Sequence, residues 1–207
     1  MVSFLFFSTI AAPSGAALFI SGGDCLNTVQ PIRDMEVLTD IKDYLRDSNY
    51  RNYIMFLIGI NTGLRISDIL RLRVRDVSGS HISLREKKTR KQKRILINYE
   101  LKKALQDFIT GKPPNEYLIR SREGINRPIT REMAYKIICQ IGDEFGLSEL
   151  GCHTLRKTFG YIFYNETTDK DIGMLMDYFN HASPKITLRY IGMEQDTMDM
   201  ALKRHKA

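Results

Sequence analysis

The chain has 207 residues, an apolar fraction of 43% and a formal net charge of +7, with a sequence pI of about 9.3. This length fits one domain, or one domain with a short appendage, and the apolar fraction is ordinary for a protein that buries a core. The three cysteines are odd in number and none forms a Cys-x-x-Cys pair, which argues against a disulfide framework and a zinc site. We therefore expect reduced thiols in a cytoplasmic protein. The net positive charge favours a polyanionic partner such as nucleic acid.

The first segment, residues 2–23, carries no charged side chain and contains the apolar run Phe4–Phe7. A secretory signal peptide would begin with a positively charged region, which this segment lacks. Serines, a glycine and Pro13 dilute the apolar character that a membrane span needs. We expect residues 1–27 to be an apolar leader or remnant, poorly ordered, ahead of a domain that covers residues 28–207.

A helical pattern begins at residue 37, where Leu38, Ile41 and Leu45 recur at spacings of three and four. An Asn-Thr-Gly sequence that ends at Gly63 is expected to close the second helix, and Thr130 is expected to cap a later one. Further helices are expected over residues 50–60, 67–72, 100–110, 131–145, 154–164, 170–178, 184–190 and 195–203.

Residues 81–84 and 94–98 alternate polar and apolar side chains, as short strands with one buried face do. The strongly basic residues 85–94 are expected to form the tip of a hairpin between these strands. Such a run is either a solvated loop or a finger that reaches DNA phosphates or a DNA groove. The whole pattern predicts a mainly α-helical protein with a small antiparallel β-sheet, an α+β fold.

Four short stretches carry basic side chains, and two of them also carry a histidine. Thr62–Asp68 reads Thr-Gly-Leu-Arg-Ile-Ser-Asp, Lys88–Lys91 reads Lys-Thr-Arg-Lys, His153–Phe159 contains His-x-x-Arg, and Asn180–Tyr190 places a histidine nine residues before a tyrosine. Together these stretches resemble the motifs of the tyrosine recombinase (phage integrase) family, in the order that family uses. One stretch alone would mean little, whereas four in order are a specific signal. The resemblance covers roughly residues 28–207.

The resemblance implies the DNA breaking-rejoining catalytic-domain fold and a site-specific DNA recombinase or integrase. Such an enzyme cleaves and rejoins strands through a 3′-phosphotyrosyl intermediate, with no metal or other cofactor. Tyr190 would be the nucleophile, and the always-charged forks of Arg65 and Arg156 would bracket the phosphoryl oxygens. Lys88 would protonate the leaving 5′ oxygen, and Lys91 is its nearest competitor.

By the resemblance, His153 and His181 complete the set of catalytic residues, and Asp68 is a supporting residue. His153 would assist proton transfer or bind a phosphoryl oxygen, His181 would bind the phosphate and orient the tyrosine, and Asp68 would orient the site. Cys152 beside His153 suggests a thiol nucleophile, but nothing else supports that interpretation, and we expect a buried structural cysteine. The residues expected to bind DNA are Arg85, Lys87, Arg90, Lys91, Lys93, Arg94 and Lys157.

Double-stranded DNA is the implied partner, with a homo-oligomer, a tetramer, assembled on it and no membrane involved. Met198, Ala201 and Leu202 share one face of the last expected helix, which in this family often packs into a neighbouring subunit. Most family members carry a core-binding domain of about a hundred residues ahead of the catalytic domain, whereas only about thirty residues stand there in this chain. Accessory DNA-bending or clamp-supplying proteins are therefore also expected, because phosphate contacts supply much of the affinity for DNA.

Two alternatives to an active recombinase stay open. The first is a catalytically silent DNA-binding regulator or truncated relic with a recombinase fold, which would have no need to keep the six expected catalytic residues. The second is a nicking-closing topoisomerase of related chemistry, which would relax supercoiled plasmid without needing a particular site.

Overall fold

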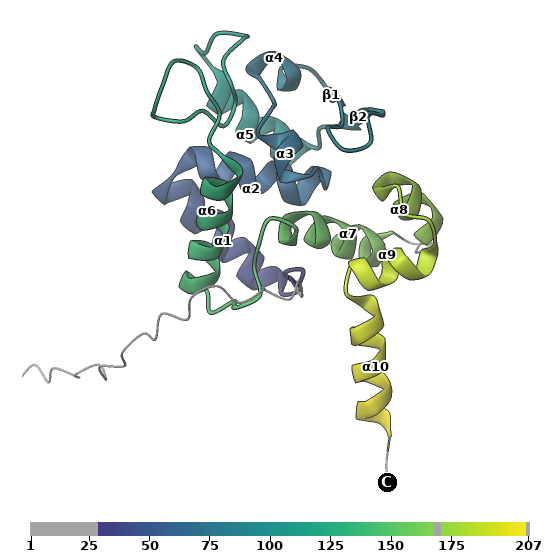
Figure 1. Ribbon diagram of the computed structural model, residues 1–207. Helices are drawn as coiled ribbons and strands as arrows, with labels where there is room; N and C mark the ends of the chain where they lie inside the picture. The colour runs from purple at the N-terminus through teal and green to yellow at the C-terminus, as the bar shows by residue number, and fades with distance from the viewer. Residues whose placement is uncertain (1–28, 168–170, 206–207) are drawn as a thin grey trace, which may run out of the picture.

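The computed structural model describes residues 29–167 and 171–205 (Figure 1). Its elements in chain order are α1 (Met35–Ser48), α2 (Tyr50–Thr62), α3 (Ile66–Ile69), α4 (Val74–Val77), β1 (His81–Arg85), β2 (Gln92–Leu96), α5 (Tyr99–Ile109), α6 (Arg131–Glu144), α7 (Thr154–Glu166), α8 (Ile172–Phe179), α9 (Pro184–Tyr190) and α10 (Met193–Arg204). This confirms the predicted mainly helical fold with a small antiparallel sheet. The expected leader, residues 1–27, lies outside the described residues, and its character stays a prediction.

Helix α2 runs through the centre of the fold. Residues 53–60 are all buried, and α1, α5 and α7 pack around this helix. The approach of α7 is closest at Gly59, where a Cβ atom would lie 2.6 Å from Cδ1 of Leu155. A larger residue at this position would push α7 away from α2. Because α7 carries Arg156 and the chain that follows α2 carries Arg65, this contact sets the distance between the two expected phosphate ligands.

Polar caps determine where most of the helices begin. The side chains that accept a hydrogen bond from a backbone N–H of the first helical turn are Asp34, Asn49, Asn98, Thr130, Asp171 and Ser183. The predicted cap at Thr130 is thereby confirmed. Gly63 ends α2 in the left-handed conformation with φ of 56°, as its position after an Asn-Thr pair predicts.

The hairpin pairs β1 with β2 in antiparallel register, from His81 opposite Leu96 to Arg85 opposite Gln92. Strand β2 begins two residues earlier than the expected strand at residues 94–98, so the turn is shorter than predicted. Ile82 and Ile95 face each other across the ladder, and both are buried. This single buried face fixes the register, because a slip of one residue would expose it.

A second, smaller apolar cluster holds the C-terminal helices together. Leu175, Phe179 and Ile191 are its buried members, and Phe159 and Tyr190 pack against them. Helix α10 follows and extends away from the body of the molecule (Figure 1). The face that Met198, Ala201 and Leu202 are expected to share stays a prediction, because Leu202 is the only one of the three whose side chain is described. Leu202 is 63% exposed.

Residues 29–167 and 171–205 contain no helix that is both long enough and apolar enough to cross a membrane.

Candidate active site

A cavity of about 650 Å³ opens between α3, the β1–β2 turn, and the first residues of α6 and α7. Its walls are made by Arg65, Ile66, Ser67, Leu70, Arg71, Lys87, Lys88, Arg131, Cys152 and His153. The cavity therefore unites residues from three of the four sequence motifs, which lie far apart along the chain. Cys152 is half-buried in its wall rather than buried as expected, and partial burial raises the pKa of its thiol.

In the fourth motif, Tyr190 contacts His153, one of the residues in the wall of this cavity. The hydroxyl oxygen of Tyr190 lies 3.2 Å from Nδ1 of His153, and the ring of His181 packs on the tyrosine ring with centroids 5.1 Å apart. Burial raises the pKa of the Tyr190 phenol, and the positive charges of Arg156 and Arg65 oppose that rise. The phenol is thus protonated at neutral pH and has a potential proton acceptor within reach.

Arg156 is fixed from several sides. The residue is 2% exposed, donates hydrogen bonds to the backbone carbonyls of Gly63 and Phe179, and stacks on the Phe179 ring at 4.3 Å. Burial lowers the pKa of its guanidinium, and Tyr190 is the main opposing influence. A side chain held in this way does not have to reorganise when a charged substrate arrives.

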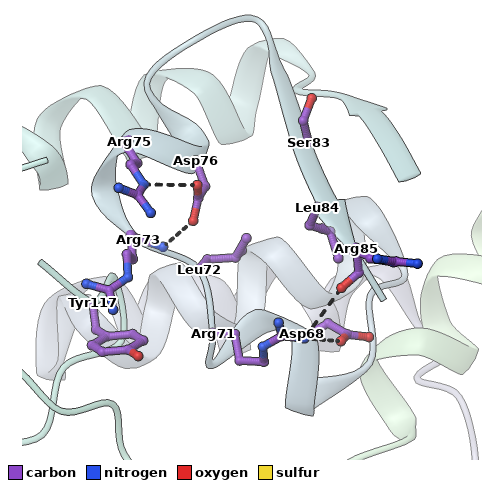
Figure 2. Close-up of a pocket in the computed structure, with 10 residues that line it drawn as sticks. All are labelled: Asp68, Arg71, Leu72, Arg73, Arg75, Asp76, Ser83, Leu84, Arg85 and Tyr117. Atoms are coloured by element: carbon purple, nitrogen blue, oxygen red, sulfur yellow. Dashed lines mark hydrogen bonds and ion pairs between the residues drawn. The ribbon is translucent and has the colours of Figure 1, made fainter. Parts of the chain in front are cut away.

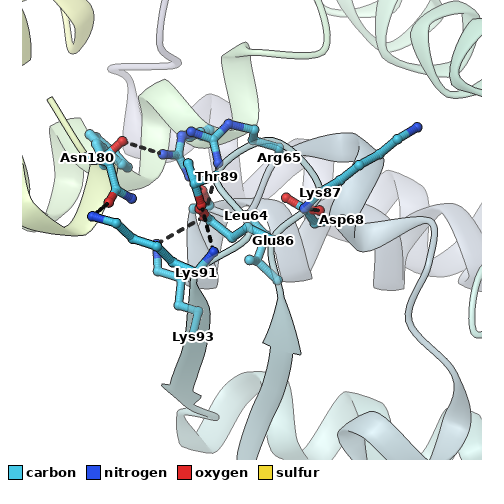
Figure 3. Close-up of polar contacts among 12 residues, drawn as sticks. Leu64, Arg65, Asp68, Glu86, Lys87, Thr89, Lys91, Lys93 and Asn180 are labelled. Atoms are coloured by element: carbon cyan, nitrogen blue, oxygen red, sulfur yellow. Dashed lines mark hydrogen bonds and ion pairs between the residues drawn. The ribbon is translucent and has the colours of Figure 1, made fainter.

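Arg65 takes part in a buried ion cluster that comes from the hairpin (Figure 3). Its Nη1 lies 3.0 Å from Oε1 of Glu86, and the Nζ of Lys93 lies 3.6 Å from the same oxygen. Burial acts to raise the pKa of the Glu86 carboxyl, but the Thr89 hydroxyl and the two cations together hold it below its ordinary value. Burial, assisted by the charge of Arg156, lowers the pKa of Lys93 to about 8.

Lys91 of the hairpin contacts the turn between α8 and α9, where the fourth motif begins. Asn180 adopts the left-handed conformation with φ of 57°, and its Oδ1 accepts a hydrogen bond of 2.7 Å from Nζ of Lys91. The next residue, His181, has its Nδ1 3.0 Å from the Thr187 hydroxyl. Burial lowers the pKa of His181, and the positive charges of Arg156 and Arg65 lower it further.

Asp68 connects α3 to the hairpin rather than to the arginines of the motifs. Its side chain is fully buried, and Oδ1 accepts a 2.8 Å hydrogen bond from the backbone N–H of Lys87. A second cavity, of about 340 Å³, has Asp68 in its lining (Figure 2). Arg71 lines both cavities and reaches the carbonyl of Arg85 as well as Asp68. Asp68 thus anchors the start of the turn that carries Lys88.

The expected DNA-binding residues divide into two groups. Arg85, Lys87, Arg90, Lys91 and Arg94 are exposed. The other two are partly buried and have partners within the chain: Lys93 donates to the carbonyl of Tyr178, and Lys157 donates to that of Val29. Contact with DNA stays a prediction for every member of both groups.

Two residues of the site were missed by the sequence reasoning. Arg131, the first residue of α6, lines the main cavity and helps to lower the pKa of His153. Glu86 is the single acidic residue of the basic run 85–94, and this lone acid among bases is the feature of the sequence that could have indicated its role. Its burial could not be read from a run that otherwise predicts an exposed loop.

Comparison with known proteins shows the family to which this chain belongs. The model of the phage integrase family matches residues 33–196. A protein named probable integrase/recombinase YoeC, from Bacillus subtilis (strain 168), is 46% identical over 179 residues, which are 86% of this chain and 97% of YoeC.

Two solved structures share the fold. XerA recombinase is 20% identical with a TM-score of 0.64, and the match covers 86% of this chain and 65% of XerA. The Tn1549 transposon integrase, solved in complex with transposon right end DNA, is 18% identical with a TM-score of 0.57 over 83% of this chain and 65% of that one. This chain thus spans about two thirds of each solved chain. Given its family match and its close relative, the chain belongs to the phage integrase family and is a tyrosine recombinase.

Proposed function

We propose that this chain cleaves and rejoins DNA at a specific site, with Tyr190 as the nucleophile. The observation that carries the proposal is the contact between the Tyr190 hydroxyl and Nδ1 of His153, 3.2 Å long, in the electrostatic field of Arg65 and Arg156. A phenol at this position has a base to take its proton and two cations to stabilise the charge that develops on the phosphate.

The first step is an in-line attack of the Tyr190 oxygen on the scissile phosphorus. His153 takes the phenolic proton, and the guanidinium groups of Arg65 and Arg156 bind the non-bridging oxygens. His181 adds a hydrogen bond to the phosphate. The bond from phosphorus to the 5′ oxygen breaks, and Lys88 at the cavity wall gives that oxygen a proton.

Rejoining reverses these steps. The 5′ hydroxyl of a second strand attacks the 3′-phosphotyrosyl bond, and the proton returns to the tyrosine oxygen as it leaves. The energy of the phosphodiester is kept in the covalent intermediate, so the reaction consumes no external energy source. The residues assigned to these steps supply acid, base and charge stabilisation by themselves.

The substrate is double-stranded DNA held by the exposed cations of the hairpin, and residues 28–207 act as the catalytic domain. We propose that a tetramer assembles on the DNA and that α10 packs into a neighbouring subunit. Accessory DNA-bending or clamp-supplying proteins would add phosphate contacts and so raise affinity. The reaction takes place in the cytoplasm, on phage or other mobile-element DNA. A monomeric complex on cognate DNA would count against the assembly.

The two other hypotheses receive less support. A silent DNA-binding regulator would not need a tyrosine that contacts a histidine within the electrostatic field of two arginines. A nicking-closing topoisomerase would use the same groups, and relaxation of supercoiled plasmid that lacks the cognate site would identify it.

A suicide substrate tests the proposal. A duplex from the genomic neighbourhood of the gene, nicked close to the cleavage position, loses a short fragment after cleavage, so the covalent intermediate cannot religate. The wild-type protein is expected to form a protein–DNA band on a denaturing gel, and Tyr190→Phe is expected to form none. Absence of the band in the wild type, with DNA binding still visible by gel shift at low salt, would favour the regulator instead.

A further inference from the structure

We infer that Glu86 is a positioning residue for strand cleavage, which holds the guanidinium of Arg65 and the ammonium of Lys93 in the places that the reaction requires. The inference rests on the strand-cleavage function proposed above. Glu86 itself would not touch DNA, because its side chain is 1% exposed. Its effect would pass through Arg65.

The contacts of Glu86 use both carboxylate oxygens (Figure 3). Oε1 lies 3.0 Å from Nη1 of Arg65 and 3.6 Å from Nζ of Lys93. Oε2 accepts a hydrogen bond from the hydroxyl of Thr89, which lies in the same turn. The carboxylate therefore joins the turn of the hairpin to the residue that follows α2. A guanidinium has five N–H donors, so Arg65 keeps others for a phosphate.

The charge balance explains why an acid is needed here. Arg65, Arg156 and Lys93 influence one another electrostatically, and all three are largely buried. Like charges that share a poorly solvated site repel strongly, and a buried cation without a partner is costly. Glu86 is the acidic group that faces these cations, so its loss would leave Arg65 free to swing toward solvent before DNA arrives.

Lys93 connects Glu86 to the end of α8 through Tyr178. Its Nζ donates to the backbone carbonyl of Tyr178 at 2.7 Å and lies 3.4 Å from the centre of the Tyr178 ring. The Tyr178 hydroxyl in turn donates to the carbonyl of Thr62, three residues before Arg65. The ion cluster thus connects the hairpin, the end of α2 and the end of α8, the elements from which Arg65 and His181 project.

The experiment measures single-turnover cleavage of the nicked substrate by the wild type, Glu86→Gln and Glu86→Asp. Glu86→Gln is expected to lower the cleavage rate at saturating DNA on the order of 10- to 100-fold, with less than about a threefold change in half-saturating DNA concentration. Glu86→Asp keeps the buried charge but withdraws it by one carbon, so its rate should be intermediate. Glu123→Gln, a neutralisation in the exposed loop before α6, is the matched control and should behave as the wild type.

A double-mutant cycle separates positioning from a general effect on the fold. Arg65→Lys already lacks the guanidinium fork, so adding Glu86→Gln to it should cost much less than in the wild-type background. Equal losses in both backgrounds would overturn the inference, and so would a wild-type rate in either Glu86 variant. A faster Glu86→Gln enzyme would also overturn it, because Glu86 would then restrain Arg65. A wild type that forms no covalent complex would instead contradict the proposed function.

Discussion

Nδ1 of His153 lies 3.2 Å from the hydroxyl oxygen of Tyr190, although the two residues are 37 positions apart in the sequence. Burial lowers the pKa of His153, and the charges of Arg131, Arg156 and other nearby cations lower it further. The imidazole is therefore neutral at pH 7 and can accept the phenolic proton.

This contact predicts an acid limb in the pH profile of cleavage. The pKa of His153 is lowered from its ordinary value of 6.5, so His153 protonation should not change the cleavage rate near pH 7, and the rate should fall as the pH drops through that lowered pKa. Single-turnover rates measured from about pH 5 to about pH 9 would trace the limb. His153→Gln should be slower and should lose the limb, and an unchanged limb in this variant would assign it to another group.

An alkaline limb is predicted from Lys93. Its pKa of about 8 lies below the ordinary 10.5, so the ammonium loses its charge as the pH rises through about 8. Among the charged groups that face it, Glu86 raises the pKa of Lys93, whereas Arg156 and Arg65 lower it. The carbonyl and the ring of Tyr178 also contact the ammonium. We expect the cleavage rate to fall above about pH 8 in the wild type and to stay level in Lys93→Arg, whose guanidinium remains charged. A decline shared by both proteins would argue against this role.

A sulfur substitution can decide which hairpin lysine is the general acid. Lys88→Ala is expected to lower cleavage of ordinary DNA by about 10²- to 10⁴-fold. A substrate with sulfur at the 5′ bridging position should restore its rate, because a thiolate leaves without needing a proton. Lys91→Ala and Lys93→Met should show no such rescue. Rescue of Lys91→Ala or of Lys93→Met, but not of Lys88→Ala, would reassign the acid.

Arg156 should matter for stability as well as for cleavage. Arg156→Met would leave the buried carbonyls of Gly63 and Phe179 without a donor, and we expect the free energy of unfolding to drop by about 2–5 kcal/mol. Arg189→Met is the control, since that side chain is 69% exposed in a surface ion pair with Glu194, and its effect should be under about 1 kcal/mol. Urea unfolding followed by circular dichroism would measure both. Equal stabilities would mean that water replaces the guanidinium in Arg156→Met.

The sequence predicts those parts of the fold that local chemistry determines. Ser183 and Pro184 mark the start of α9, and its predicted range agrees with the structure. Helix α4 was missed because four residues are too few to show a helical period. The helix expected at residues 67–72 is the shorter α3, which ends at Ile69.

The candidate site likewise contains residues that the sequence motifs predict and residues that only the packing of the chain reveals. The motifs select Arg65, His153 and Tyr190 by residue type and order. In the structure Arg65 and His153 line one cavity, and the hydroxyl of Tyr190 contacts His153. The burial of Glu86 and Lys93 depends on how the hairpin packs against the end of α8, a long-range contact that leaves no local pattern in the sequence. Their lowered pKa values could therefore be recognised only in three dimensions.

The most direct test of the whole account is to identify the residue that becomes bonded to DNA. The covalent complex from the suicide substrate would be digested with nuclease and trypsin, and the peptides would be sequenced by mass spectrometry. We predict a single modified peptide, with a 3′-linked nucleotide on the oxygen of Tyr190. A nucleotide on any other residue, such as Tyr178 or Cys152, would contradict the central claim.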